Sequence, residues 1–200
     1  MSVLRAVFFD WGGVVIDDPA PGFIRTFADH FHIDADRMKA FFSPYEHLFQ
    51  TGRMTERELW EKAYLAFGKK VPEGISLWKE AVRAVFIDKP GTIALVHTLK
   101  SRGIRTALVT NTEVPTRDYY FEKDYPFDRA VFSCDEGSAK PDELIYRRAL
   151  ERVSVTAAEA AFIDDKPANV EAAVSLGMRG ILFTTIEDVT RSLADVLSER

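Results

Sequence analysis

Four short polar segments of this sequence each come after an apolar run, and together they supply carboxylates, a hydroxyl, an amide and an amine. The segments contain Asp10, Thr110 with Asn111, Lys140, and Asp164 with Asp165. Carboxylates brought close together raise one another's pKa values or require a cation, and carboxylate and carbonyl oxygens with water suit Mg²⁺. A metal ion, a lysine and small hydroxyl and amide donors form a phosphate-binding set, in which an aspartate can attack phosphorus to form an aspartyl-phosphate. The residue types therefore indicate metal-assisted phosphoryl chemistry, provided that the segments meet.

Each segment on its own has a simpler structural interpretation. A carboxylate after a strand often caps a helix, Thr-Asn often forms a turn, and a lysine before a proline is usually a solvated surface residue. Four such segments in this order on one edge of a sheet are hard to explain as caps and turns alone, so we favour a shared site.

The polar segments are positioned by short apolar runs that predict β-strands. These runs are Val3–Phe9, Ile104–Val109, Ala130–Phe132, Ala160–Ile163 and Gly180–Phe183. Helical patterns accompany them over Thr92–Arg102, Pro141–Val153 and Pro167–Leu176. The alternation predicts βαβ units with right-handed crossovers, and hence a doubly wound, Rossmann-like α/β core whose parallel sheet is covered on both faces. Ligands of such sheets bind beyond the carboxyl ends of the strands, which is where the polar segments fall.

The stretch from about Pro21 to Val85 has no strand pattern. Amphipathic helices are expected over Phe23–Phe31, Met38–Phe42, Glu56–Phe67 and Leu77–Phe86. Thr55 and Glu58 form the T-x-x-E pattern of a capping box at the start of one of them. We therefore predict a small α-helical cap over residues 17–87, inserted after the first strand of a core made of residues 1–16 and 88–200.

The order of the polar segments resembles that of a known family, the haloacid dehalogenase-like hydrolases. The matching motifs are FFDWGGVV (Phe8–Val15), LVTNT (Leu108–Thr112), SAKPD (Ser138–Asp142) and FIDDKPANVEAA (Phe162–Ala173). The resemblance covers nearly the whole chain, and the helical insertion is similar to the small cap of that family. The fourth motif is most similar to the branch that includes phosphatase domains fused to epoxide hydrolases.

The resemblance implies a role for each motif residue. Asp10 would be the nucleophile and a Mg²⁺ ligand, together with the carbonyl of Gly12 and the carboxylate of Asp165. Phosphoryl oxygens would be held by Thr110, Asn111 and Lys140. Asp164 would hold Lys140 or a metal-bound water in place without lying among the direct ligands of the metal. The implied substrate is a small phosphorylated metabolite.

One position departs from the pattern of the family's phosphatases. They carry a second aspartate two residues after the nucleophile, which protonates the leaving group, and here that residue is Gly12. The loss of a general acid costs about 10²–10⁴ in rate. Two alternatives therefore stay open beside a phosphatase: a non-catalytic or weakly active protein that binds a phosphorylated ligand, and a 2-haloacid dehalogenase-type hydrolase. The second explains Gly12, because halide leaves as an anion, but it leaves the Asp164-Asp165 pair unexplained.

A substitute acid would have to come from elsewhere in the chain. Asp17 and Asp18 follow the first motif, and His47 lies in the cap. A turn into the cap explains the two aspartates better, and an exposed or packed position explains the histidine better. Without a substitute, turnover should fall steeply as the pKa of the leaving group rises. Trp11, beside the nucleophile, is expected to pack against the pocket wall rather than to bind a cofactor.

Composition excludes several other classes of protein. The chain has 200 residues, a formal net charge of −5 and no long basic run, which argues against broad nucleic-acid binding. No apolar stretch approaches the length of about 20 residues that a membrane span needs, and the N-terminal run predicts a strand rather than a signal peptide. The single cysteine, Cys134, excludes an internal disulfide and a cysteine zinc site. We expect a cytoplasmic monomer or homodimer.

Overall fold

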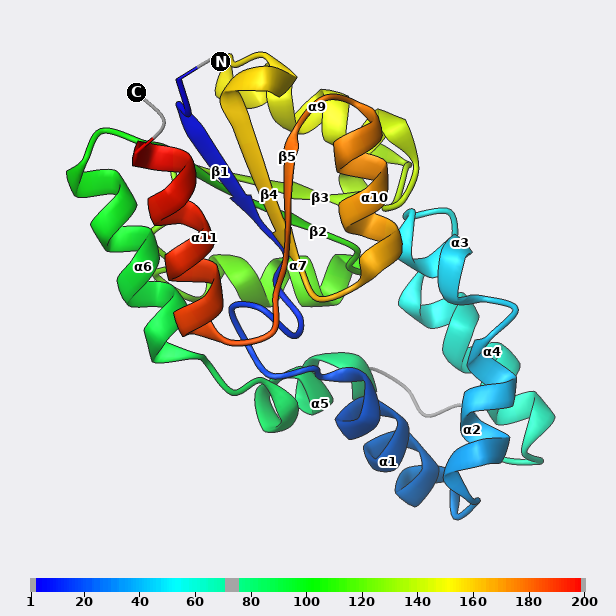
Figure 1. Ribbon diagram of the computed structural model, residues 1–200. Coiled ribbons are helices and arrows are strands. Elements are labelled where there is room, and N and C mark those ends of the chain that lie inside the picture. Colours follow the sequence, from blue (N-terminus) through cyan, green and yellow to red (C-terminus); the bar gives the residue numbers. More distant parts are fainter. Residues whose placement is uncertain (1–2, 71–75, 199–200) are drawn as a thin grey trace.

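The computed structural model describes residues 3–70 and 76–198 and has a five-stranded parallel sheet at its centre (Figure 1). The strands are β1 (Ala6–Phe9), β2 (Arg105–Thr110), β3 (Arg129–Phe132), β4 (Ala160–Asp164) and β5 (Arg179–Leu182). Their order is β3-β2-β1-β4-β5, so the chain builds outward on one side of β1 and then crosses to the other side. The predicted doubly wound α/β core is confirmed, and the reversal of strand order lies between β1 and β4.

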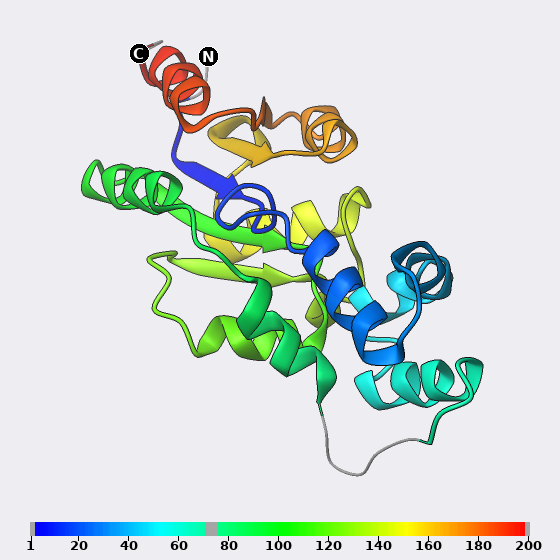
Figure 2. The ribbon, with the colours of Figure 1, turned by 90° about the horizontal axis from the view of Figure 1, so that it is seen from below.

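Helices cover both faces of the sheet because its strands are apolar on both faces. Val7 and Phe9 of β1 belong to one apolar cluster, and Ala6 and Phe8 belong to the other. The helices that follow the cap in the chain are α6 (Pro90–Ser101), α7 (Val114–Phe121), α8 (Ser133–Glu136), α9 (Glu143–Val153), α10 (Pro167–Ser175) and α11 (Ile186–Ser198). Helices α6 and α11 cover one face, and α9 and α10 cover the other, as Figure 2 shows from below.

The segment between β1 and α6 is helical, as predicted. It contains α1 (Ala20–Phe31), α2 (Ala35–Phe42), α3 (Glu46–Gln50), α4 (Glu56–Ala66) and α5 (Leu77–Val85). Its interior is aromatic: the ring of Trp78 lies 4.8 Å from those of Phe23 and Phe49. The capping box at Thr55 is present. These helices lie beyond the carboxyl ends of the strands (Figure 1), so they cover the edge of the sheet where the polar segments converge.

The segment that leaves the core after β1 lies beside the segment that returns to the core before α6. The backbone N–H of Asp17 donates to the carbonyl of Ile87, and the N–H of Lys89 donates to the carbonyl of Val15. A division between cap and core at residues 17 and 87 remains a prediction. No helix within the described ranges is long and apolar enough to cross a membrane.

Candidate active site

Asp10, Thr110 and Asp164 stand at the carboxyl ends of three adjacent strands. Asp10 follows β1, Thr110 ends β2, and Asp164 ends β4. The parallel register aligns Phe9 with Leu108 on one side and with Ile163 on the other, so these ends reach the same edge of the sheet. All three residues are buried. The topology therefore brings together side chains that lie up to 154 positions apart in the sequence.

Lys140 connects the two aspartates. Its Nζ lies 2.7 Å from Oδ1 of Asp10 and 2.7 Å from Oδ2 of Asp164. The lysine is only 4% exposed, so its interpretation as a solvated surface residue is wrong. A buried ammonium is costly unless it is paired, and here two carboxylates pair with it.

Asp164 is held from several directions at once. The backbone N–H of Lys166 donates to its Oδ1 over 2.8 Å. The side-chain amide of Asn169 lies 3.0 Å from both carboxylate oxygens. With Lys140 on Oδ2, these donors occupy most of the lone pairs of Asp164. The geometry suits a residue that orients Lys140 from behind.

Asp165, unlike Asp164, has a buried carboxylate oxygen, Oδ1, that accepts no hydrogen bond from the described residues. Asp10, Asp164 and Asp165 each offer a carboxylate oxygen, and these oxygens lie within 4.8 Å of one another. A Cβ at Gly13 would overlap the carboxylate of Asp165, so glycine leaves the space that this carboxylate occupies. An unpartnered buried carboxylate oxygen in an acidic cluster fits a hard divalent cation such as Mg²⁺.

Burial dominates the electrostatics of Asp10. The pKa of Asp10 is raised to about 7, chiefly by burial and also by the charge of Asp164, while Lys140 opposes the rise. The backbone N–H of Trp11 donates to Oδ1 of Asp10 over 2.6 Å and also favours the charged form. Burial and the charge of Asp164 raise the pKa of Asp165 as well. A cation at this cluster would favour both charged forms.

Asn111 fixes the backbone of Lys140 as well as lining the site. Its side-chain Nδ2 donates to the carbonyl of Lys140 over 2.8 Å, and its Oδ1 accepts the N–H of Lys140 over 2.7 Å. One N–H of the amide remains available for a ligand. The second and third sequence motifs are therefore locked together through their backbones.

These side chains open into a cavity of about 390 Å³ between the sheet edge and the cap. The predicted site residues that line it are Asp10, Gly12, Thr110, Asn111 and Lys140. Trp11, Phe23 and Phe86 supply apolar wall. Trp11 packs edge-on against Phe86, with ring centroids 5.0 Å apart, as expected of a wall residue.

Sequence reasoning missed two acidic residues of this cavity, Glu113 and Glu46. Glu113 caps α7 directly after the second motif, and Pro115 in the first turn of that helix marks the position in the sequence. The pKa of Glu113 is raised to about 7, chiefly by burial and to a lesser degree by the charge of Glu46. Glu46 begins α3, whose five residues are too short to show a helical period.

The other residues considered from the sequence lie in different settings. Asp18 is exposed and lines the cavity, whereas Asp17 is exposed and lies 3.8 Å from the Nζ of Lys89. His47 is exposed and does not line the described cavity. Burial raises the pKa of the Cys134 thiol to about 12, so this cysteine is a neutral packing residue.

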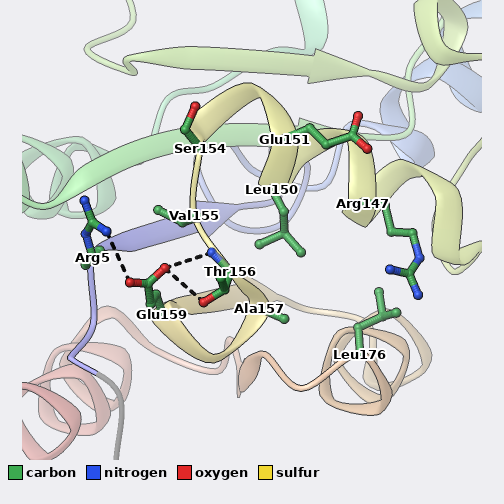
Figure 3. A pocket seen from close by; sticks show the side chains of 10 residues that line it. All are labelled: Arg5, Arg147, Leu150, Glu151, Ser154, Val155, Thr156, Ala157, Glu159 and Leu176. Atoms are coloured by element: carbon green, nitrogen blue, oxygen red, sulfur yellow. Dashed lines mark hydrogen bonds and ion pairs between the residues drawn. The ribbon is translucent and has the colours of Figure 1, made fainter.

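A larger cavity of about 670 Å³ lies at the opposite end of the strands, before β1 and β4 (Figure 3). Its charges are already paired: Arg5 contacts Glu159 over 3.2 Å, and Arg147 pairs with Glu143. Glu159 also accepts hydrogen bonds from the backbone N–H and the hydroxyl of Thr156. Five of the site residues predicted from the sequence line the smaller cavity instead, at the edge where the strand order reverses.

Comparison with known proteins agrees with this geometry. The family model of the haloacid dehalogenase-like hydrolases matches residues 4–177. The chain is 28% identical to bifunctional epoxide hydrolase 2 of Rattus norvegicus, over 96% of this chain and 39% of that protein. It is 37% identical to the sesquiterpene phosphatase astK of Aspergillus oryzae, over 46% of this chain and 48% of that protein. The chain thus spans less than half the length of either curated relative.

A solved structure shows the same fold. It is an enzyme of Bacteroides thetaiotaomicron in complex with magnesium and inorganic phosphate, and it superposes with a TM-score of 0.76 at 19% identity, over 90% of this chain and 94% of that one.

Proposed function

Because this chain belongs to the haloacid dehalogenase-like hydrolases, we propose that it is a Mg²⁺-dependent phosphatase of a small phosphorylated metabolite. The observation that carries the proposal is the buried Asp10–Lys140–Asp164 arrangement beside the unpartnered oxygen of Asp165. A nucleophilic carboxylate, a buried cation and a set of acidic metal ligands are what an aspartyl-phosphate mechanism needs.

Asp10 and Asp165, with the carbonyl of Gly12, would hold the Mg²⁺ ion, and Asp164 would support them from behind. When bound, Mg²⁺ neutralises charge on the transferring phosphoryl group and on the carboxylates that surround it.

The chain's own residues account for the transfer. A carboxylate oxygen of Asp10 attacks phosphorus, the bond to the leaving oxygen breaks, and an aspartyl-phosphate forms. Lys140 places its ammonium where negative charge accumulates, and Thr110 and Asn111 donate hydrogen bonds to the phosphoryl oxygens. Water then hydrolyses the aspartyl-phosphate, which releases inorganic phosphate and restores Asp10.

Two comparisons support this choice within the family. One relative is named a sesquiterpene phosphatase, and the solved structure from Bacteroides thetaiotaomicron contains magnesium and phosphate. The cluster of Asp10, Asp164 and Asp165 argues against a dehalogenase, because uncompensated carboxylates repel an anionic haloacid.

Gly12 favours a second candidate, a protein that binds a phosphorylated ligand without turning it over. The position of the family's acid has no side chain to donate a proton. Such a protein would bind phosphate esters with Mg²⁺ but release no inorganic phosphate.

The test is a panel of phosphorylated metabolites assayed for phosphate release with Mg²⁺, with EDTA, and with Mg²⁺ restored after EDTA. We expect turnover that EDTA abolishes and Mg²⁺ restores. Undiminished hydrolysis in EDTA would refute metal dependence. Binding of esters in calorimetry with no release of phosphate would favour the non-catalytic candidate.

A further inference from the structure

The position that should hold the general acid has no side chain, and little room is left for one. A Cβ at Gly12 would lie 3.2 Å from Cδ of Pro19, tighter than an ordinary van der Waals contact. The entrance to the cap therefore occupies the space next to Gly12. A proton for the leaving group has to come from another wall of the cavity.

We propose that Glu113 is this proton donor and that it takes a proton back from the water that hydrolyses the aspartyl-phosphate. Glu113 lines the same cavity as Asp10 and Lys140, and it follows Asn111 by two residues. The inference rests on the proposed phosphatase function and assigns the acid–base step of that site.

The surroundings of Glu113 hold its carboxyl group in place. The residue is 9% exposed, and one carboxyl oxygen accepts a hydrogen bond of 3.0 Å from the hydroxyl of Thr116. The indole N–H of Trp78, on α5 of the cap, donates to the hydroxyl oxygen of Thr116 over 2.7 Å. The hydroxyl proton of Thr116 is therefore directed toward Glu113. Among the described residues, the groups that act most strongly on the Glu113 carboxyl group are hydrogen-bond donors and Glu46, and none of them is a cation. A buried carboxyl group without a cationic partner favours its protonated form.

The charge environment matches that role. Burial raises the pKa of Glu113 to about 7, and the hydrogen bond from Thr116 opposes the rise. Two other elements contribute titratable neighbours. Glu46 on α3 contributes to the raised pKa, and Cys134 on α8 interacts with the carboxyl group while staying neutral. An acid is most effective when its pKa lies near the working pH.

The cap is fixed in register with this part of the core. The hydroxyl of Ser133 donates to the carbonyl of Gln50 over 2.6 Å and accepts the N–H of Thr112 over 2.8 Å. This one hydroxyl therefore joins α3, which carries Glu46, to the segment that carries Glu113. Both Glu46 and Glu113 line the cavity, and this contact fixes the two segments that carry them relative to each other.

The proposed step balances as follows. As Asp10 attacks, the bond from phosphorus to the leaving oxygen breaks, and the proton of the Glu113 carboxyl group passes to that oxygen to give an alcohol. The Glu113 carboxylate then accepts a proton from the attacking water, whose oxygen bonds to phosphorus as the bond to Asp10 breaks. Glu113 ends protonated and Asp10 ends as a carboxylate.

Asp18 is the competing donor, because it also lines the cavity. It is exposed, and its Oδ1 accepts the backbone N–H of Ala20 over 3.0 Å at the start of α1. This exposed carboxylate is held in the turn that precedes α1, whereas the carboxyl group of Glu113 is buried in the cavity wall.

The experiment compares kcat/KM for p-nitrophenyl phosphate and for glycerol 1-phosphate with Mg²⁺ in wild type, Glu113→Gln, Glu46→Gln and Asp18→Asn. Since nitrophenolate leaves without a proton, Glu113→Gln should keep the aryl value within about threefold and lose about 10²-fold or more on the alkyl ester. Retained aryl activity shows that the variant is folded. Glu46→Gln should change both values little but move the alkaline limb of the alkyl pH profile to lower pH, and Asp18→Asn should change neither ester.

Several results would overturn the assignment. Unchanged alkyl hydrolysis in Glu113→Gln, equal losses on both esters, or a selective alkyl loss in Asp18→Asn would each exclude Glu113 as the donor while the phosphatase function stands. If wild type releases phosphate from neither of these esters nor from any member of the metabolite panel, the phosphatase function itself fails, and the role of Glu113 falls with it.

Discussion

Replacing Lys140 by methionine should destabilise the protein strongly, although the two side chains have similar volume. The Nζ of Lys140 is buried between Asp10 and Asp164, 2.7 Å from an oxygen of each. Methionine keeps the packing against Phe162, above whose ring the ammonium lies at 5.3 Å. The substitution therefore removes the charge with little loss of packed volume.

The magnitude follows from the two contacts. With an effective dielectric constant of about 20, unit charges 2.7 Å apart attract by about 6 kcal/mol. The desolvation of the three ions offsets much of this attraction. Breaking a buried pair by removing one partner costs about 3–5 kcal/mol, and we expect Lys140→Met to lie in that range in EDTA.

The sign of the pH dependence can also be stated. Without Lys140, the pKa of Asp10, already raised to about 7 by burial, rises further. Stability from a group with a raised pKa is complete below its unfolded value and is lost as the pH rises through the folded value. The deficit of Lys140→Met should therefore be larger at pH 8 than at pH 5.

The assay is urea unfolding followed by circular dichroism, in EDTA, at both pH values. Lys166→Met is the matched control, because Lys166 is an exposed lysine of the same cavity and surface substitutions change stability by about 0.5 kcal/mol or less. Adding Asp164→Asn to Lys140→Met should recover part of the loss. A deficit below about 1 kcal/mol at pH 8, or one that grows at low pH, would refute the view that Lys140 compensates two buried carboxylates.

Three further predictions concern single positions. Asp10→Asn should abolish phosphate release and leave the circular dichroism spectrum unchanged, since the amide oxygen can still accept the N–H of Trp11; turnover at the wild-type rate would place the nucleophile elsewhere. Because the folded pKa of Glu113 is about 7 against an ordinary 4.5, its stabilisation is lost as the pH rises, so wild type should lose about 2–3 kcal/mol relative to Glu113→Gln between pH 5 and pH 8 in urea unfolding; a pH-independent difference would contradict this. Gly12→Asp should lower the free energy of unfolding by about 1 kcal/mol through its contact with Pro19, with the same loss in Gly12→Ala; a stable Gly12→Asp variant would show that Pro19 gives way.

The secondary structure could be predicted where local pattern was sufficient. All five strands lie within a few residues of the apolar runs, because fully buried parallel strands are continuous apolar stretches. The helix predicted from Pro141 begins at Glu143, with Asp142 as its N-cap. Helix α11 was missed, although Ile186, Val189 and Leu193 have the spacing of one helical face.

The site residues fall into two groups for a physical reason. Asp10, Thr110 and Asp164 could be predicted from the sequence, because any parallel sheet brings the carboxyl ends of neighbouring strands to one edge. Their chemistry then follows from residue type alone. The burial of Lys140 could not be predicted, since it depends on where the loop before α9 places the side chain.

The cavity above these residues was decided by tertiary structure alone. Glu46 lines the same cavity as Glu113, and the hydroxyl of Ser133 joins α3 to the core there across 83 positions of sequence. No local pattern encodes that contact, and a helix of five residues leaves no period to detect. The sequence by itself therefore determined the fold and the family's reactive side chains, which local patterning and strand topology specify. Tertiary packing of the cap decided which acids face the ligand and which carboxyl group is buried enough to hold a proton near neutral pH.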